Sequence, residues 1–231
     1  MKDFLHYAAR LALTFLLVFL LCSLITPVHA EVRVEAGVGS SNYVPTPDGA
    51  WYQLGAPDNK LQMHGRAFQI GLVDDVKVAD VLGVALHADY VNLGHARSYC
   101  RCATDDAAYN HDTRTIAPGA PLAVFSGTGM AQGLKLAAVP YVDVQGWKLG
   151  YERGVLIYSP RFVDNVYGAN GAFTQLTTPT TTKSAGVFGF FVTHGRYTLS
   201  YENYRMPINW ARESVPPVWT GAHVLLLSYQ L

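Results

Sequence analysis

The stretch Gly221–Leu231, with the sequence GAHVLLLSYQL, decides the fold class of this chain. Counting back from the end, an apolar residue stands at every second position: Leu231, Tyr229, Leu227 and Leu225. The positions between them hold Gln230, Ser228, Leu226 and Val224. A period of two is that of a β-strand, whose side chains point alternately to two faces. The stretch therefore predicts a β-strand with two unlike faces.

Seven further segments show the same alternation. Each is about 8–12 residues long, which is the length that a tilted strand needs to cross a bilayer. Gln132 and Arg153 break the outward apolar pattern of the fourth and fifth of these segments. The eight predicted strands are Val32–Gly39, Gly65–Val73, Leu82–Leu93, Gly129–Val139, Lys148–Tyr158, Ser184–Thr193, Tyr197–Arg205 and Gly221–Leu231.

Short and long connections alternate strictly between these strands. The short ones are Asp74–Val81, Pro140–Trp147 and His194–Arg196, and the long ones are Ser40–His64, Gly94–Thr128, Ser159–Lys183 and Met206–Thr220. This alternation is typical of a barrel with its chain ends and short turns in the periplasm and its long loops outside. We therefore predict an all-β fold, an eight-stranded antiparallel up-and-down transmembrane β-barrel with long external loops. An even strand number closes the sheet, so no strand edge faces lipid.

Residues 1–30 have the organisation of an export signal. Lys2 and Arg10 flank the start of an apolar run that ends near Ile25, and Val28-His29-Ala30 forms a small-residue cleavage site. The apolar run is about 15 residues long, short of the roughly 20 that a spanning helix needs, although an uncleaved anchor is the alternative. We therefore predict a signal peptide at residues 1–30 and an outer-membrane β-barrel at residues 31–231.

The composition supports a membrane barrel. Charged residues make up 15% of the chain, aromatic residues 12%, and the formal net charge is zero. So few charges are unusual for a soluble surface, whereas a barrel exposes an apolar band with aromatic girdles. The chain has no basic field of the kind that binds nucleic acid, so we expect no nucleic-acid partner. We expect no cofactor.

The pattern resembles the small eight-stranded outer-membrane barrels of the OmpA/OmpX-like family. The resemblance spans the chain after residue 30, and at residue level it rests on Ala88-Asp89-Tyr90-Val91-Asn92-Leu93-Gly94 and on the closing strand. That strand ends in Leu231, where the family usually has an aromatic residue. The resemblance implies localisation in the bacterial outer membrane, with outer-membrane lipid and lipopolysaccharide as neighbours. It also implies recognition of the C-terminal strand by the barrel-assembly machinery.

Several inward-facing positions carry charges of both signs. The interior of an eight-stranded barrel is just wide enough to be filled by side chains. Buried charges there need partners to offset their desolvation. We therefore predict a salt-bridged plug, with a proton- or ion-conducting path as the alternative. The residues are Arg33, Glu35, His87, Asp89, Lys135, Lys148, Glu152 and Glu202.

A catalytic site is a second hypothesis, because barrels of this kind include lipid A-modifying and lipid-hydrolysing enzymes. A hydrolase needs a histidine beside a serine, oriented by an acid or an amide. The candidate is His223, expected in the outer aromatic girdle with Trp219 and Trp210, and the preceding loop offers Ser214 and Glu213. An interfacial histidine that reaches lipid headgroups is the non-catalytic alternative, and we favour it.

The motif Cys100-Arg101-Cys102 lies in the longest predicted external loop. A disulfide is compatible with an oxidising compartment, and two free thiols or an intermolecular bridge are the alternatives. A metal site using both thiolates and His111 would follow no recognised zinc spacing, so we predict no metal site. The motif is therefore a predicted disulfide or thiol pair.

These patterns together predict an outer-membrane barrel with a structural or surface-interaction role. The external loops would carry that role and would meet an extracellular ligand. The alternatives are a lipid A-modifying or lipid-hydrolysing enzyme and a narrow pore.

Overall fold

The structure is a computed structural model that describes residues 32–46, 53–178, 181–208 and 217–231. The predicted signal peptide at residues 1–30 lies outside these ranges, and so do Trp210, Glu213 and Ser214. Within the described ranges, no helix has the length and apolar character that crossing a bilayer requires.

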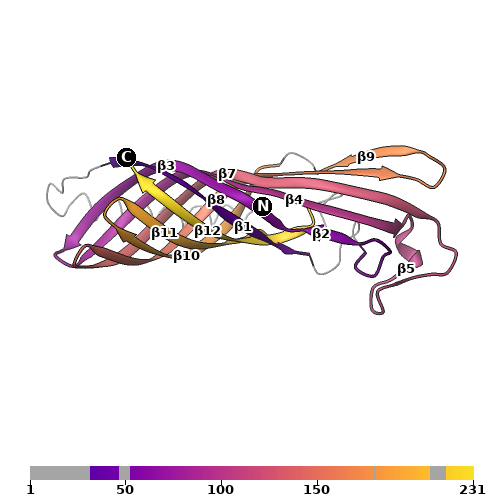
Figure 1. The fold of residues 1–231 in the computed structure, drawn as a ribbon, viewed down its shortest axis with the longest axis horizontal. Coiled ribbons are helices and arrows are strands. Elements are labelled where there is room, and N and C mark those ends of the chain that lie inside the picture. The colour runs from indigo at the N-terminus through magenta and orange to yellow at the C-terminus, as the bar shows by residue number, and fades with distance from the viewer. Residues whose placement is uncertain (1–31, 47–52, 179–180, 209–216) are drawn as a thin grey trace, which may run out of the picture. The chain divides into compact units, whose positions relative to one another are not determined.

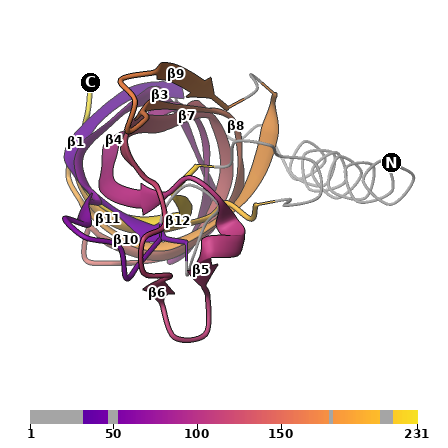
Figure 2. The same cartoon turned by 90° about the vertical axis from the view of Figure 1, so that its right-hand side faces the viewer.

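Eight antiparallel strands form a closed barrel (Figures 1 and 2). They are β1 (Val32–Pro45), β3 (His64–Ala79), β4 (Leu82–Ala103), β7 (Leu122–Val144), β8 (Trp147–Tyr167), β10 (Lys183–His194), β11 (Tyr197–Arg205) and β12 (Trp219–Gln230). Each of them pairs with the next one along the chain, and β12 pairs with β1 to close the ring. The predicted eight-stranded barrel is therefore confirmed.

The strands are staggered around the ring. Directly facing residues can be followed from strand to strand through His64, Asn42, His223, Asn203, Phe188, Arg153, Ala138, Leu86 and Asp74. The path leaves β3 at His64 and returns to β3 at Asp74, ten residues further along. A stagger of this kind tilts the strands against the barrel axis. It also places His64 near the external rim and Asp74 near the opposite rim.

Tight two-residue turns join strands at the end that carries Val32 and Leu231. They are Asp80-Val81, Gln145-Gly146 and Gly195-Arg196, each within a predicted short connection. Gln145 and Gly146 both have positive φ, 55° and 82°, as a two-residue type I′ hairpin requires. Short turns mark the periplasmic end of such barrels.

The outer wall of the barrel carries an apolar belt. Its exposed side chains include Val38, Phe68, Ile70, Leu134, Ile157, Phe190, Leu225 and Leu227. The alternate residues of the same strands are buried inside, for example Gln69, Lys135, Leu226 and Ser228. An apolar exterior around a closed ring of strands fits the hydrocarbon core of the outer membrane.

Three strands continue far beyond their predicted outer ends. β4 runs to Ala103, β7 starts at Leu122 and β8 runs to Tyr167. The prediction of loops over residues 94–103, 122–128 and 159–167 was therefore wrong. Alternating apolar residues mark only the part of a strand that meets lipid, whereas strands in water can pair without that pattern.

Short elements flank these extensions. β2 (Lys60–Gln62) pairs with β4, and β9 (Phe173–Thr177) pairs with β8. A 3-10 turn at Asp106–Ala108 precedes the small hairpin of β5 (Tyr109–Asn110) and β6 (Thr115–Ile116).

Candidate functional site

Lys135 occupies the centre of the barrel lumen. Its Nζ lies 2.9 Å from Glu152 Oε1, 3.0 Å from Glu202 Oε1 and 3.3 Å from Asp89 Oδ2. The Lys135 side chain is 1% exposed, so this ammonium group meets carboxylates instead of water. Inward-facing positions of β4, β7, β8 and β11 bring the four side chains together.

Amide and hydroxyl groups extend this cluster across the lumen. Gln69 accepts a hydrogen bond from Lys135 Nζ at 3.3 Å and donates one to Glu35 Oε1 at 3.2 Å. Gln230 donates to the other oxygen of Glu35 at 3.1 Å, and His87 Nδ1 lies 3.7 Å from Asp89 Oδ2. Six of the eight predicted lumen residues therefore lie in one cluster: Glu35, His87, Asp89, Lys135, Glu152 and Glu202.

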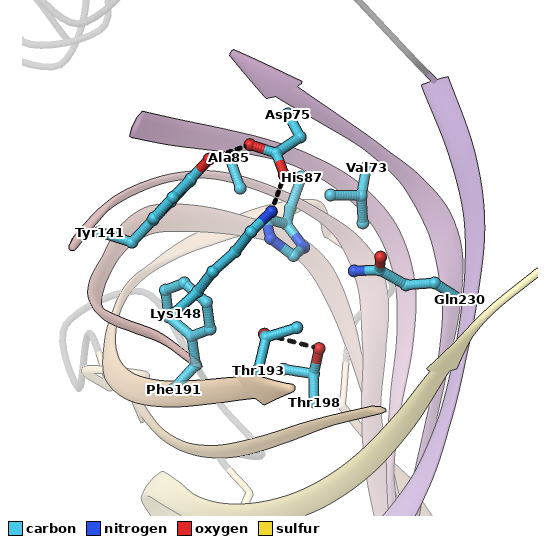
Figure 3. A pocket seen from close by; sticks show the side chains of 10 residues that line it. All are labelled: Val73, Asp75, Ala85, His87, Tyr141, Lys148, Phe191, Thr193, Thr198 and Gln230. Carbon is cyan, nitrogen blue, oxygen red and sulfur yellow. Dashed lines mark hydrogen bonds and ion pairs between the residues drawn. The ribbon is translucent and has the colours of Figure 1, made fainter. Parts of the chain in front are cut away.

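The other two predicted lumen residues lie at the periplasmic mouth. Arg33 donates to Gln230 Oε1 at 3.3 Å, and Lys148 forms an ion pair with Asp75. Figure 3 shows Tyr141 and Lys148 directed at the same Asp75 carboxylate. The cavity between these groups has a volume of about 20 Å³, room for about one water molecule.

Aromatic side chains fill the outer part of the lumen. The Trp219 ring lies 4.9 Å from that of Tyr43 and 5.8 Å from that of Phe162, between ring centroids. Trp219 is fully buried, so its predicted place in the outer girdle was wrong. The pairing of β1 and β12 shifts by one residue between Val44 and Pro45, which turns Trp219 inward. From the external end to the periplasmic end, the lumen thus holds the aromatic side chains, then the charge cluster, and then the small cavity at the periplasmic mouth.

Beyond the belt, five strands form one antiparallel sheet in the order β2, β4, β7, β8 and β9. Figure 1 shows the long strands β4 and β7 and the β8–β9 hairpin projecting beyond the barrel wall. The sheet continues the barrel strands, with one register shift in the β4–β7 pairing between Asn92 and His95, so an ordered scaffold positions its side chains outside the membrane.

The inner face of this external sheet has its own packing. Cys100 and Cys102 form a disulfide and are buried. The Gln53 side chain forms two hydrogen bonds with the backbone of Ala103. Its Oε1 accepts from Ala103 N at 2.8 Å, and its Nε2 donates to Ala103 O at 3.3 Å. These bonds tie Gln53 to the end of β4, although Gln53 lies in the long connection Ser40–His64 that the sequence pattern predicted.

Asp164 is a buried carboxylate on the same inner face. It is 1% exposed, and its Oδ1 has no hydrogen-bond partner among the described residues. Burial raises the pKa of Asp164 to about 7, although a backbone hydrogen bond with Ser126 favours the charged form. Asp164 was not among the predicted site residues, because the predicted strand in this part of the chain ends at Tyr158 and Asp164 lies in the extension of β8 beyond it.

The outer face of the sheet and the adjoining end of β3 are basic. Arg97 on β4 pairs with Gln62 on β2 and with Thr128 on β7. Two residues along the same ladder, Met130 on β7 pairs with His95 on β4 and with Arg161 on β8. Every charged residue that points outward from these described strand ends is basic, and all are exposed: Lys60, His64, Arg66, His95, Arg97, Arg101 and Arg161. We call this set the basic face. Asp58, in the segment before β2, lies 3.9 Å from Arg101.

His223 lies on the outside of the barrel near the external rim. Its Nδ1 is 2.8 Å from Tyr201 Oη and 2.7 Å from Asn203 Nδ2, so two neighbours on β11 fix the ring. No described serine or cysteine hydrogen-bonds to the ring. The candidates Ser214 and Glu213 lie outside the described residues, and no described His, Cys, Asp and Glu group has a metal-binding arrangement.

Comparisons with known proteins give similarity at the level of structure. No family model matches the sequence, and no curated protein matches it. Among solved structures, the chain is similar to Ail, the attachment invasion locus protein of Yersinia pestis, in complex with the heparin analogue sucrose octasulfate. The identity is 13%, the match covers 87% of this chain and 99% of that chain, and the TM-score is 0.43. A second structure of Ail has 12% identity, the same coverage and a TM-score of 0.37.

The fold is assigned from the geometry of the chain itself. A closed ring of eight antiparallel strands has an apolar exterior and an interior filled by polar and aromatic side chains. The chain therefore has the fold of the small eight-stranded outer-membrane β-barrels.

Proposed function

We propose that this protein is an outer-membrane interaction protein whose basic face binds clustered phosphate or sulfate groups on sugars. The observation that carries this proposal is the gathering of basic side chains on one face of an ordered external sheet. Arginine binds such oxyanions through two parallel hydrogen bonds, which gives geometric selectivity as well as charge attraction.

The spacing of the basic face suits a ligand with several anionic groups. Arg161 and His95 point outward from positions that flank Met130, two strands apart, so they stand about 10 Å from each other. Arg97 follows His95 on β4 and points the same way. A ligand with one anionic group would use a single arginine, whereas a sulfated or phosphorylated sugar would contact several.

The position of the basic face relative to the membrane limits which anionic sugars it can reach. The same strand faces carry the top of the apolar belt directly below it, at Phe68, Leu134 and Ile157. Lys60, Arg66 and Arg97 therefore stand at the level of the outer-leaflet headgroups or just above them. Two sources present anionic sugars there: the lipopolysaccharide of the same membrane and sulfated glycans on another surface.

The filled lumen supports an interaction role over the alternative of a pore. Lys135 and its carboxylates occupy the centre, and Trp219 with Phe162 fills the outer part. Tyr201 and Asn203 both hold His223 Nδ1, which suits a contact between the fixed ring and lipid headgroups.

The proposal includes export and assembly. Residues 1–30 would direct the chain across the inner membrane and be removed, so that the barrel is residues 31–231. The strand β12 would be the element that the barrel-assembly machinery recognises.

Binding to the protein in nanodiscs tests the proposed function. One arm uses heparin oligosaccharides with phosphatidylcholine nanodiscs, and the other measures retention of purified lipopolysaccharide. We expect Arg97→Gln with Arg161→Gln to weaken binding about a hundredfold or more, since two charge-assisted contacts of about 1.5–3 kcal/mol each are lost. Arg114→Gln is the matched control, because Arg114 is exposed in the turn between β5 and β6 and lies off the basic face.

The two arms separate the ligand sources. Loss of heparin binding alone would indicate a sulfated glycan, and loss of lipopolysaccharide retention alone would indicate the protein's own membrane. Binding that is unchanged by the double substitution in both arms would overturn the proposal.

A further inference from the structure

β9 is the last strand of the external sheet, and its second edge has no partner among the described strands. Its five residues, Phe173–Thr177, contain no charge and no proline, and all but Leu176 are exposed. The opposite end of the sheet is different, since β2 has three residues and begins with Lys60. Natural proteins usually protect sheet edges with charge, proline or shortness. β9 lacks the first two protections.

The hairpin geometry identifies the backbone groups on the open edge. Gly168 N donates to Ala172 O at 2.8 Å, so this pair is hydrogen-bonded across the β8–β9 hairpin. Bonded and non-bonded pairs alternate along an antiparallel ladder. Thr174 and Leu176 therefore bond β8, whereas Phe173, Gln175 and Thr177 direct their N–H and C=O groups away from it.

We propose that this open edge pairs with β9 of a second copy, antiparallel and centred on Gln175. In that arrangement Gln175 faces Gln175 of the second copy, and Phe173 faces Thr177. These positions all present their backbone groups to the open edge, so each facing pair exchanges two hydrogen bonds. The side-chain pairs are amide with amide and aromatic with β-branched, both favourable across strands, and no charges oppose each other.

The direction of β9 decides where the second copy lies. Figure 1 shows the β8–β9 hairpin running along the long axis of the barrel, away from it. Antiparallel pairing reverses the strand direction and therefore reverses the axis of the second barrel. A bilayer holds all copies in one orientation, so the two copies lie in facing membranes.

Pairing within one membrane meets a register conflict. There the two strands would run parallel, with the same edge of each strand facing the other. In a parallel ladder a residue bonds the two neighbours of the residue opposite it, so one of the two strands would have to shift by one residue. Two identical barrels seated at the same depth in one bilayer have no such shift. The open edge is thus a contact between two membranes.

A single five-residue pairing is weak. Many copies on each of two facing membranes act together, and multivalent contacts exceed the single affinity by orders of magnitude. The expected outcome is adhesion between membranes that carry the protein, with little dimer in dilute detergent.

Vesicle clustering tests this inference. The protein is reconstituted in phosphatidylcholine vesicles, whose neutral lipid gives the basic face no anionic partner, and clustering is followed by light scattering. We expect wild-type vesicles to cluster. Gln175→Lys and Gln175→Glu should each abolish clustering, because like charges then meet at the centre of the pair. An equal mixture of the two variant vesicles should restore it.

Further variants separate edge pairing from other causes. Asn165→Lys adds the same charge beside Gln175 on β8 but off the open edge, and it should cluster as wild type does. Gln175→Cys should form disulfides between vesicles. Dispersed wild-type vesicles, or single-charge variants that still cluster, would overturn the inference. Binding of heparin should be unchanged by Gln175→Glu, so failure here leaves the proposed function untouched.

Discussion

Lys135 Nζ lies 2.9 Å from Glu152 Oε1 in the centre of the barrel, with both side chains at 5% exposure or less. The same ammonium group also pairs with Asp89 and Glu202. We expect Lys135→Met to lower the free energy of unfolding by about 3–5 kcal/mol, because it leaves buried carboxylates without their common cation. Urea unfolding of the reconstituted barrel measures this loss.

Lys148→Met is the matched control for this prediction. Lys148 also pairs with a carboxylate, Asp75, but both side chains are partly exposed at the periplasmic mouth. The loss of stability there should stay near 1 kcal/mol or below. Equal losses for the two lysine variants would contradict a structural role of the central cluster.

The stability of the external sheet should depend on pH through Asp164. An unfolded aspartate releases its proton near pH 4, whereas burial raises the pKa of Asp164 in the folded chain to about 7. Between these values the folded state binds more protons, so the sheet loses stability as the pH rises from about 4 to about 7.

Asp164→Asn removes this dependence. At pH 8 the variant should open less often than wild type, by about 1–3 kcal/mol in the free energy of opening, and at pH 4 the two should agree. Hydrogen exchange of the β8 and β9 amides measures the opening. Asp112→Asn, at an exposed carboxylate, should have no effect. A wild-type sheet that is more stable at pH 8 than at pH 4 would refute this assignment.

The Cys100–Cys102 disulfide should be resistant in the folded protein. Both residues are at most 1% exposed, and Gln53 N donates to Cys102 Sγ at 3.4 Å. Peptide mass spectrometry should find the segment lighter by two hydrogens and inert to alkylation until the chain is unfolded and reduced. Changing both cysteines to serine should cost about 1–2 kcal/mol, because the closed loop is very short. Ready alkylation of the folded protein would show free thiols.

We expect His223 to have no effect on the acyl chains of lipid A. Tyr201 and Asn203 fix its ring on the outer wall, which suits a contact with headgroups. Lipid A mass spectra from cells with wild-type protein and with His223→Ala should therefore be the same as those from cells without the protein. A change in acyl chains that depends on His223 would establish the enzymatic alternative.

Much of the barrel could be predicted from the sequence, because the lipid-facing side chains follow a local rule. The alternation in Gly221–Leu231 and its counterparts reflects which residues meet lipid. The short connections follow from turns such as Gln145-Gly146. For the same reason the sequence predicted that Lys135 and Glu152 point into the lumen, although it did not predict which side chains they contact there.

The external sheet could not be predicted in this way. β9 and β2 are held by pairing to β8 and β4, and neither has an alternating pattern of its own. The inward turn of Trp219 depends on a shift in the pairing of β12 with β1, a partner far away in the chain. Gln69 and Gln230 were not predicted as members of the lumen cluster, because that prediction rested on charged residues at inward positions and both side chains are uncharged amides.

The salt dependence of heparin binding is the sharpest test of the proposal that the basic face is the contact surface. The protein in phosphatidylcholine nanodiscs is titrated with heparin oligosaccharides at salt concentrations from about 50 to about 200 mM. We expect the logarithm of the affinity to fall linearly with the logarithm of the salt concentration, because bound anionic groups release counterions. The slope should become shallower in the Arg97→Gln, Arg161→Gln double variant. An affinity independent of salt, or an unchanged slope in that variant, would contradict the assignment of the basic face as the contact surface.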